Sequence, residues 1–228
     1  MASGNIINDI YDVTIDKINR PNRPLPSGEI SSRKALILYF IFLLLSLIFS
    51  WFINLPAFLI VAVTTFILYL YSKYLKRLPL IGNIVVAFLT GLVFIYGGFV
   101  SGNPSAAIIP ALFAFLINLV REIVKDMEDV EGDRKADAIT FPIKFGVQKS
   151  KYAILIISLT LILCTLYPFI TQLYKIEYFI FVMVFANPIL VYCLKILFAD
   201  QSQKNLKKIS NLLKLSMVFG LIAIYFGV

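Results

Sequence analysis

Long apolar stretches alternate with short polar connections along almost the whole chain. Each stretch is about 17 residues or longer, which is near the length an α-helix needs to cross the hydrocarbon core of a bilayer. The pattern therefore predicts an all-α, polytopic transmembrane helix bundle, with seven full spanning helices after a short N-terminal helix. The predicted spans are Ala35–Ile53, Pro56–Ser72, Ile84–Val100, Ala106–Val124, Tyr152–Ile170, Tyr178–Phe198 and Asn211–Val228.

Composition agrees with a membrane protein and excludes several kinds of chemistry. The 228 residues are 60% hydrophobic, and the mean hydropathy of +0.88 is far above that of a soluble globular chain. The chain has no histidine, which excludes a Ser-His-Asp triad, a His-ligated zinc and a His general base. Its two cysteines, Cys164 and Cys193, lie inside predicted spans, make no zinc motif and are not expected to form a disulfide.

The basic residues fall on one side of the predicted topology. Every Lys and Arg except Lys175 lies in, or next to, the connections that a bundle of alternating helices places on a single side. The positive-inside rule makes that side cytoplasmic, so the sequence predicts a multi-pass protein of the cell membrane. The formal net charge of +8 is then mainly a topological signal and does not indicate a nucleic-acid partner.

One acidic pattern occurs twice on the predicted cytoplasmic side. Residues 8–17 read NDIYDVTIDK and residues 125–134 read KDMEDVEGDR. Both contain D-x-x-D-x-x-x-D followed by a base, at an offset of 117 positions. The next predicted helices keep this offset, which indicates one membrane-embedded domain, residues 1–228, built from an internal duplication with halves of about 1–105 and 106–228. In the second half two spanning helices precede the motif, so the comparison predicts that about one and a half helices are missing before residue 1.

The spacing of the acidic residues favours a magnesium site. On a helix, Asn8, Asp12 and Asp16 share one face because they are four residues apart. Asp126, Asp129 and Asp133 are spaced by three and four residues and are also expected to share a face, with Glu122 one turn earlier. Carboxylate and amide oxygens without His or Cys suit Mg²⁺, which usually keeps part of its coordination shell for phosphate oxygens. Two such faces across a cavity would hold Mg²⁺ ions that bridge a diphosphate.

Basic side chains near both motifs are candidates for binding that diphosphate. The segment KINRPNRPLPSG carries Arg20 and Arg23, and its three prolines predict a stiff, extended arm. A second connection supplies Lys73 and Lys76, and the second motif is flanked by Arg121 and Lys125. The alternative is that these residues only set topology or extend their amines to the membrane surface.

Two other classes of membrane protein are compatible with parts of this pattern. A divalent-cation transporter would need carboxylates near the middle of its spans, where this sequence has none. A structural lipid-binding protein gives no reason for two matching acidic motifs.

The two motifs resemble those of the UbiA superfamily of intramembrane prenyltransferases. That family carries N-x-x-x-D-x-x-x-D on one cytoplasmic segment and D-x-x-D-x-x-x-D on another, and the resemblance extends over the whole chain. The stretch TFPIKFG after the second motif is also similar. Within the superfamily, NDIYDVTIDKINRPNRPLPSG and REIVKDMEDVEGDR look most like the archaeal enzymes that form the second ether bond of membrane lipids.

The resemblance implies a UbiA-like fold and a Mg²⁺-dependent prenyltransferase. Its substrates would be geranylgeranyl diphosphate and the hydroxyl of geranylgeranylglyceryl phosphate, a membrane lipid, and no obligate protein partner is evident. A related enzyme with an aromatic or chlorin acceptor is the alternative. By carry-over, Asp12, Asp126 and Asp129 would be catalytic. The implied metal ligands are Asn8, Asp12, Asp16, Asp126, Asp129 and Asp133, and the implied substrate contacts are Asn8, Arg20, Arg23, Lys73, Lys76, Arg121 and Lys125.

Overall fold

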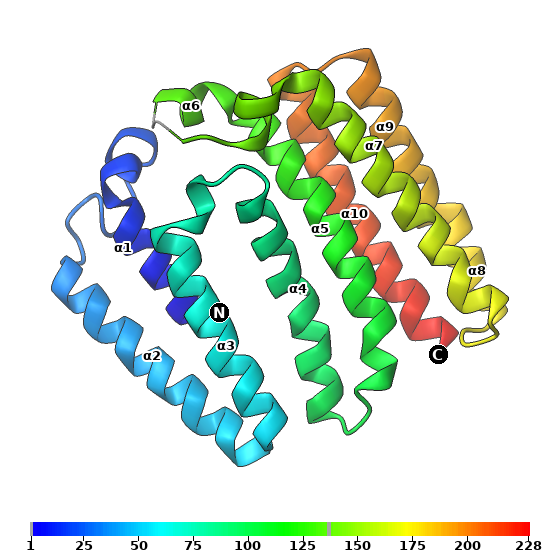
Figure 1. Ribbon diagram of the computed structural model, residues 1–228, viewed down its shortest axis with the longest axis horizontal. Helices are drawn as coiled ribbons and strands as arrows, with labels where there is room; N and C mark the ends of the chain where they lie inside the picture. The colour runs from blue at the N-terminus through cyan, green and yellow to red at the C-terminus, as the bar shows by residue number, and fades with distance from the viewer. Residues whose placement is uncertain (1, 136–137) are drawn as a thin grey trace.

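Helices account for all the regular secondary structure in residues 2–135 and 138–228, the part of the chain that the computed structural model describes (Figure 1). The α-helices are α1 (Ala2–Asn19), α2 (Ser32–Ile53), α3 (Leu55–Lys73), α4 (Ile81–Val100), α5 (Ile108–Glu128), α6 (Val130–Lys135), α7 (Phe141–Ile170), α8 (Ile176–Phe181), α9 (Asn187–Ala199) and α10 (Gln203–Gly227). Two short 3₁₀ turns, η1 (Leu75–Arg77) and η2 (Ser105–Ala107), precede α4 and α5. A π-helical turn, η3 (Val182–Ala186), joins α8 to α9.

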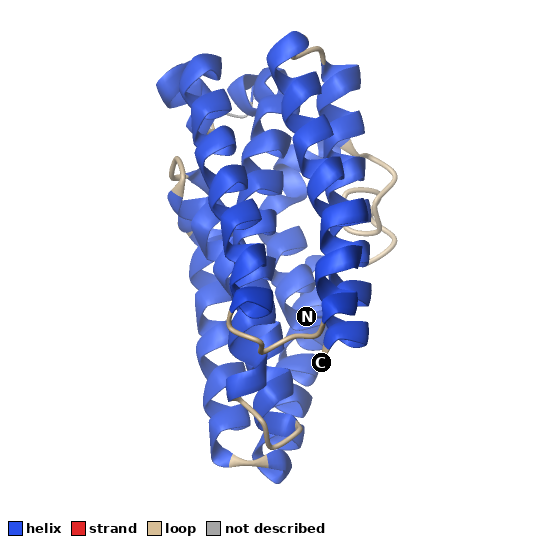
Figure 2. Cartoon of the chain, turned by 90° about the vertical axis from the view of Figure 1, so that its right-hand side faces the viewer, coloured by secondary structure: helices blue, strands red, loops and turns tan. Residues whose placement is uncertain are grey.

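The seven predicted spans are confirmed, although α10 begins at Gln203, eight residues before the predicted start at Asn211. Seven helical segments in the described residues are long and apolar enough to cross a membrane, with α8, η3 and α9 forming one of them. They run roughly along one axis with their connections at the two ends (Figure 2). Successive spans are antiparallel, so the end of α1, the start of α2, η1 and α6 meet at the same end of the bundle (Figure 1). This is the end at which the sequence places the basic residues, and we refer to it as the basic end.

Local capping explains where two of the spans begin. The side chain of Ser31 accepts a hydrogen bond from the backbone amide of Lys34 and starts α2. Asn54 ends α2 and starts α3, because its Oδ1 accepts from the amide of Ala57 at 2.8 Å. The Nδ2 of the same residue donates to the carbonyl of Phe99 at 3.0 Å, which ties the α2–α3 turn to α4.

The prediction that residues 125–151 form a polar connection was wrong for the second half of that segment. Helix α7 begins at Phe141, well before the predicted start at Tyr152. Gly146 interrupts it with φ 85° and ψ 160°, values that glycine adopts without steric cost. The first turns escaped the hydropathy pattern because they mix Phe141 and Phe145 with lysines, although Pro142 is well suited to a helix start.

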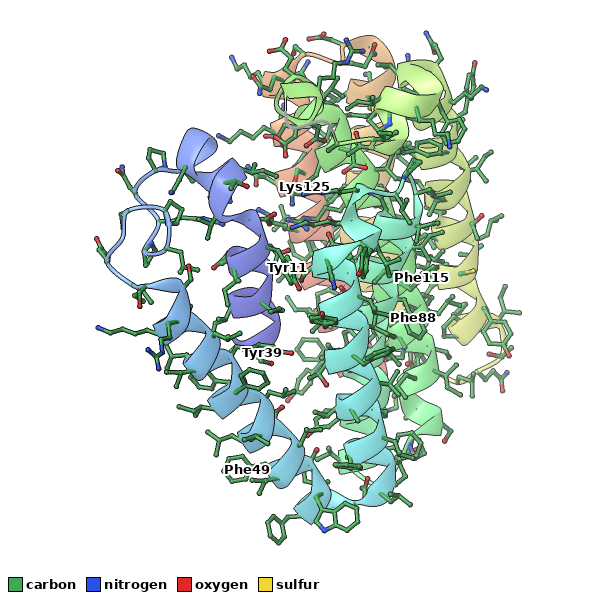
Figure 3. The ribbon with its side chains drawn as sticks, turned by 60° about the vertical axis from the view of Figure 1, so that its left-hand side comes forward. Tyr11, Tyr39, Phe49, Phe88, Phe115 and Lys125 are labelled. Atoms are coloured by element: carbon green, nitrogen blue, oxygen red, sulfur yellow. The ribbon has the colours of Figure 1, made fainter. Side chains whose placement is uncertain are left out.

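Helix α5 is the central element of the larger part of the bundle. It packs against α4, α7 and α10, and the side chains of Val120, Ile123 and Val124 are fully buried in this core. Helix α2 is the opposite case, because its apolar side chains are mostly exposed and Phe49 lies on its outer surface (Figure 3). Exposed apolar side chains on a span are suited to contact with lipid tails.

Helix α1 completes the arrangement on the side of α2 and α3. It packs against both helices, and the ring of Tyr11 meets the ring of Tyr69 on α3 edge to face, at 6.3 Å between centroids. Its C-terminal end lies at the basic end, as does the C-terminal end of α5 (Figure 1). The fold therefore brings the two acidic segments to the same end of the bundle.

Candidate active site

The first acidic segment, on α1, is linked to the connection between α3 and α4 through Lys76. Asn8 donates from Nδ2 to Oδ2 of Asp12 at 2.9 Å. The Nζ of Lys76 forms an ion pair with Oδ1 of Asp12 and lies 3.5 Å from Oδ1 of Asn8. Both side chains of the ion pair are largely buried, which strengthens the interaction relative to a surface pair.

The third member of this motif, Asp16, has a different cation. One guanidinium nitrogen of Arg23 lies 2.6 Å from Asp16 and 3.2 Å from Asp9. The carboxylate of Asp16 is almost completely buried, whereas that of Asp9 is half-buried. The structure therefore divides the predicted triad, with Asn8 and Asp12 against Lys76 and with Asp16 against Arg23.

The predicted extended arm was wrong. Residues 21–30 form a compact series of turns, in which the amide of Ser27 donates to the carbonyl of Arg23 and the amide of Ile30 donates to that of Pro24. Proline fixes φ near −65°, which suits turn positions as well as extended backbone, and Gly28 supplies a φ of 86°. The turns fold Arg23 back onto α1 and leave Arg20 exposed.

The second acidic segment was predicted to lie on one helical face, and this was also wrong. Helix α5 extends beyond the predicted end at Val124, so Asp126 lies in its last turn. The helix ends at Asp129, whose φ of −98° and ψ of 7° break the regular path before α6 begins. Asp129 is exposed and Asp133 lies on the short α6, so the triad follows a bend in place of a continuous helix.

The carboxylates of this second segment have weaker charge compensation. Asp126 accepts a hydrogen bond of 2.8 Å from Nδ2 of Asn83, a neutral amide on α4. Glu122, one turn earlier, pairs with Arg121 at 2.9 Å. Burial, together with the nearby charge of Asp129, raises the pKa of Asp133 to about 6. A bound cation would therefore relieve an unfavourable accumulation of negative charge.

A small polar cavity of about 40 Å³ lies beside the second segment. It is lined by Lys76, Asn83, Glu122 and Asp126, together with Tyr71, Leu78, Gly82 and Thr140. Lys76 thus contacts the first motif and faces the cavity of the second. A Cβ at Gly82 would lie 3.2 Å from the carbonyl oxygen of Leu75, a tight contact, so glycine favours the packing here. The close approach of η1 to α4 positions Lys76.

Not every predicted site residue lies at this cavity. Arg121 and Lys125 are half-buried on α5, next to Glu122 and Asp126, and Lys125 lies at the same end of the bundle as Tyr11 (Figure 3). Lys73 is exposed, and its Nζ lies 4.9 Å from the centre of the Tyr74 ring and 5.8 Å from that of Tyr69. The geometry therefore separates Lys76, which faces the site, from Lys73, which does not.

The sequence did not lead us to Asn83 or Tyr71, and Asp9 was left out of the predicted ligands although it belongs to the first motif. Asn83 is a buried polar residue at the start of an apolar span, in the stretch RLPLIGN, and that position was a signal that could have been used. Tyr71 offered no comparable signal, because tyrosine is common near the ends of spans. Asp9 is the first aspartate of the repeated motif, but it lies one residue after Asn8 and so off the assumed face, and only the return of Arg23 reveals its role.

The donor set fits Mg²⁺. All candidate ligands are carboxylate or amide oxygens, which are hard donors. Among the residues that the structure describes, no group of three or more carboxylate, His or Cys side chains is close enough to hold a metal ion by itself. Mg²⁺ is commonly bound by one or two carboxylates and completed by substrate phosphate oxygens and water. Asn8 and Asp12 on one side, and Asp126 on the other, match that requirement.

A membrane-embedded helical bundle with two oxygen-rich clusters and a bridging lysine at one end defines a protein suited to polyphosphate chemistry at a membrane surface. Residues 1–218 match the model of the UbiA prenyltransferase family, and the chain belongs to this family.

Proteins similar to this chain include two archaeal relatives, both named digeranylgeranylglyceryl phosphate synthase. The one from Methanosphaera stadtmanae is 40% identical over 99% of this chain and 83% of its own length. The one from Methanocaldococcus jannaschii is 39% identical over 99% of this chain and 79% of its own length.

Two solved structures are also similar. One, described as digeranylgeranylglyceryl phosphate synthase in membranes, has a TM-score of 0.85 at 38% identity and covers 99% of this chain and 80% of that chain. The other, a UbiA homologue from Archaeoglobus fulgidus bound to GPP and Mg²⁺, has a TM-score of 0.70 at 25% identity, over 98% of this chain and 83% of that chain.

Proposed function

We propose that this chain is a Mg²⁺-dependent prenyltransferase that moves a geranylgeranyl group from geranylgeranyl diphosphate to the free hydroxyl of geranylgeranylglyceryl phosphate. The observation that carries the proposal is the meeting of two acidic segments at one end of a UbiA-family bundle, with Lys76 between them. The relatives that carry the name of this synthase support the choice of acceptor.

The metal ligands that we propose are Asn8 and Asp12 on α1 and Asp126 on α5, with Asp16, Asp129 and Asp133 as further candidates. Bound there, Mg²⁺ would act as a Lewis acid on the oxygens of the leaving diphosphate. Lys76 supplies a positive charge between the two clusters and stabilises the negative charge that develops as the diphosphate departs. Arg121 and Lys125 are placed to add to this stabilisation.

The reaction breaks the bond between C1 of the prenyl group and the diphosphate oxygen, and the electron pair leaves with the diphosphate. A bond forms between C1 and the hydroxyl oxygen of the acceptor, and the hydroxyl proton passes to the departing diphosphate or to a carboxylate of the site. Apolar helix surfaces exclude water, which would otherwise compete with the acceptor for C1. The role of the protein is therefore to hold both substrates, offset charge and keep the reacting carbon dry.

Analysis of the reaction product tests which acceptor the chain uses. Purified chain would be incubated with geranylgeranyl diphosphate, Mg²⁺ and one acceptor at a time, and the products would be measured by mass spectrometry. We expect the diether product with geranylgeranylglyceryl phosphate. Prenylation of an aromatic or chlorin acceptor alone would assign the chain to another branch of the family, and release of free geranylgeraniol without transfer would contradict the proposal.

We also propose that the basic end faces the cytoplasm, on the basis of the positive-inside rule. The native cysteines lie in spans, so single cysteines introduced in a Cys-free background report the side of each connection. Cysteine at Ser27 should react with a membrane-impermeant maleimide only after the cells are opened. Cysteine at Ser105, at the other end of the bundle, should react in intact spheroplasts. The reverse labelling would overturn this orientation.

A further inference from the structure

A shallow groove on the outer surface of α9 has no part in the chemistry at the acidic segments. Val191 and Tyr192, two of its lining residues, are exposed on a membrane-spanning segment, so the groove faces lipid. We propose that it binds one anionic phospholipid of the surrounding bilayer, with the phosphate held by Lys195 and Lys208 and one hydrocarbon chain lying along the groove. The volume of the groove is about 400 Å³, and it is lined by Met183, Asn187, Pro188, Val191, Tyr192 and Lys195.

The two lysines lie at the depth of lipid headgroups. Lys195 is four residues before the end of α9 and Lys208 five residues after the start of α10, and these two helix ends meet at the basic end (Figure 1). At 1.5 Å per residue, both are about 6–8 Å inside their spans, a depth from which a lysine side chain reaches the headgroups. Lys208 donates from Nζ to the hydroxyl of Tyr192 at 3.1 Å, and Lys195 shares the helical face of Tyr192. Both amines therefore belong to the basic end of the groove.

The positive charge of these lysines is available to a ligand. None of the ion pairs in the described residues includes Lys195 or Lys208. The acid that follows Lys195 in the sequence, Asp200, instead accepts hydrogen bonds from the side chains of Ser202 and Asn205, at 2.8 Å and 2.7 Å. Lysines beside a membrane surface attract anionic headgroups, and the attraction adds up with each lysine. The pair should therefore prefer an anionic lipid to a zwitterionic one.

The rest of the groove suits a hydrocarbon chain. The π-helical turn η3 and Pro188 follow each other closely, and both features bend helices. Met183 on this turn and Pro188 just after it line the groove, so the hollow coincides with the irregular part of the span. From Lys195 to Met183 the groove extends about 18 Å, at 1.5 Å per residue. This is close to half of the hydrocarbon core, which is about 30 Å thick, so one leaflet's chain fits and a free phosphate ion would leave most of the groove empty.

The headgroup contacts are tested by native mass spectrometry of the purified chain in detergent, titrated with phosphatidylglycerol or with phosphatidylcholine. We expect the unmodified chain to bind one phosphatidylglycerol more tightly than any phosphatidylcholine. Lys195→Ala and Lys208→Ala should each weaken that binding by about 5-fold, and the double variant by about 25-fold. Lys207→Ala is the matched control, because Lys207 is exposed on the same helix as Lys208 and does not line the groove, so it should change the affinity by less than about twofold. Lys195→Arg, which keeps the charge, should retain binding.

The hydrocarbon contact is tested by filling the groove without changing charge. Val191→Phe should weaken phosphatidylglycerol binding by about 10-fold, the scale of steric discrimination in an apolar pocket. Val218→Phe, at an exposed position of α10 outside the groove, should leave the affinity unchanged. Glycerol phosphate, which carries the phosphate without a hydrocarbon chain, should not displace the lipid.

Four results would overturn the inference, in variants that elute as a single species. They are equal affinity of the unmodified chain for the two lipids, equal losses in Lys207→Ala and in the double lysine variant, displacement of the lipid by glycerol phosphate, and dimers that Val191→Phe abolishes. The third would assign the lysines to a small anion, and the fourth would make the groove a contact between two copies of the chain. None of these measurements depends on prenyl transfer, so the inference and the proposed function can fail separately.

Discussion

The two acidic segments share one spacing of aspartates but have different surroundings. The first lies on a single helix, and its carboxylates are compensated by two cations, Lys76 and Arg23. The second bends at Asp129, and its most enclosed carboxylate, Asp126, is held by the neutral amide of Asn83. Equal sequence patterns have therefore become one charge-compensated cluster and one cluster with excess negative charge.

The difference comes from the path that the chain takes after each motif. After α1, the turns of residues 20–30 return Arg23 to the helix that precedes them. After α5, the chain leaves for α6 and α7 and returns no cation that forms an ion pair with Asp126 in the described residues. Asp126 also lies in the last turn of α5, where the negative end of the helix dipole disfavours a carboxylate. The second segment should thus depend more strongly on a bound cation.

The largest effect on kcat/KM is expected when one carboxylate is removed from each segment, which tests the comparison directly. We expect Asp126→Ala and Asp12→Ala each to lower kcat/KM by about 1000-fold or more, because a metal ligand and its share of transition-state stabilisation are lost together. The two variants should differ in metal dependence, with apparent Mg²⁺ affinity weakened more by Asp126→Ala. Initial rates across a Mg²⁺ titration measure both quantities. Retention of more than about a tenth of the activity by either variant would remove that residue from the proposed site.

The two cations of the first segment should also differ. Lys76→Ala removes the charge between the segments, so we expect kcat/KM to fall by about 100-fold. Arg23→Ala should cost only about 10-fold, because the guanidinium contacts Asp9 and Asp16, on the α2 side of α1.

The free energy of unfolding should rank the two cations in the opposite order, with Arg23 contributing more to stability than Lys76. Arg23→Ala leaves the buried carboxylate of Asp16 without its partner, which should destabilise the fold by about 1–3 kcal/mol after allowance for the partial exposure of Arg23. The double variant Arg23→Ala/Asp16→Ala should recover part of that loss. Equal kinetic and stability effects for Lys76→Ala and Arg23→Ala would show that the first segment is one cluster.

Hydropathy alone was sufficient to predict the spans, since the seven apolar stretches match seven helical segments to within a few residues at most ends. It failed at the starts of α7 and α10, where apolar residues are mixed with lysines, because a window average cannot separate an amphipathic first turn from a loop. The internal duplication stays a prediction.

The site was predictable where it depended on local spacing and unpredictable where it depended on chain reversal. Asn8 and Asp12 lie on one face of α1, as their spacing indicated. The pairing of Arg23 with Asp16 needed the turns of residues 21–30, and the hydrogen bond from Asn83 to Asp126 needed the packing of α4 on α5. Neither long-range relation leaves a periodic signal in the sequence.

A smaller effect is expected from the amide that holds Asp126. Asn83→Ala removes the hydrogen bond that orients this carboxylate, and outer partners of metal ligands typically contribute about 10- to 100-fold to metal affinity. We expect a shift of that size in the apparent Mg²⁺ affinity, with the maximal rate at saturating Mg²⁺ reduced less than about threefold. Asn83→Gln, which keeps the amide on a longer side chain, is the conservative control. A fall in maximal rate without a shift in Mg²⁺ dependence would show that Asn83 acts on the fold or the substrate.

The smallest expected effect separates two lysines of the same connection. Lys73 and Lys76 are three residues apart, and both were predicted to bind phosphate. The amine of Lys73 instead lies over the rings of Tyr69 and Tyr74 at the exposed end of α3, where a cation–π contact contributes about 0.5–1 kcal/mol. Lys73→Ala should therefore change kcat/KM by less than about twofold, against about 100-fold for Lys76→Ala under the same conditions. A loss for Lys73→Ala that approaches that of Lys76→Ala, with the KM for the prenyl diphosphate raised, would mean that Lys73 leaves its aromatic neighbours when substrate binds and reaches the diphosphate. The comparison of the two variants thus decides whether the phosphate contacts are confined to the side of η1 that faces α1 and α5.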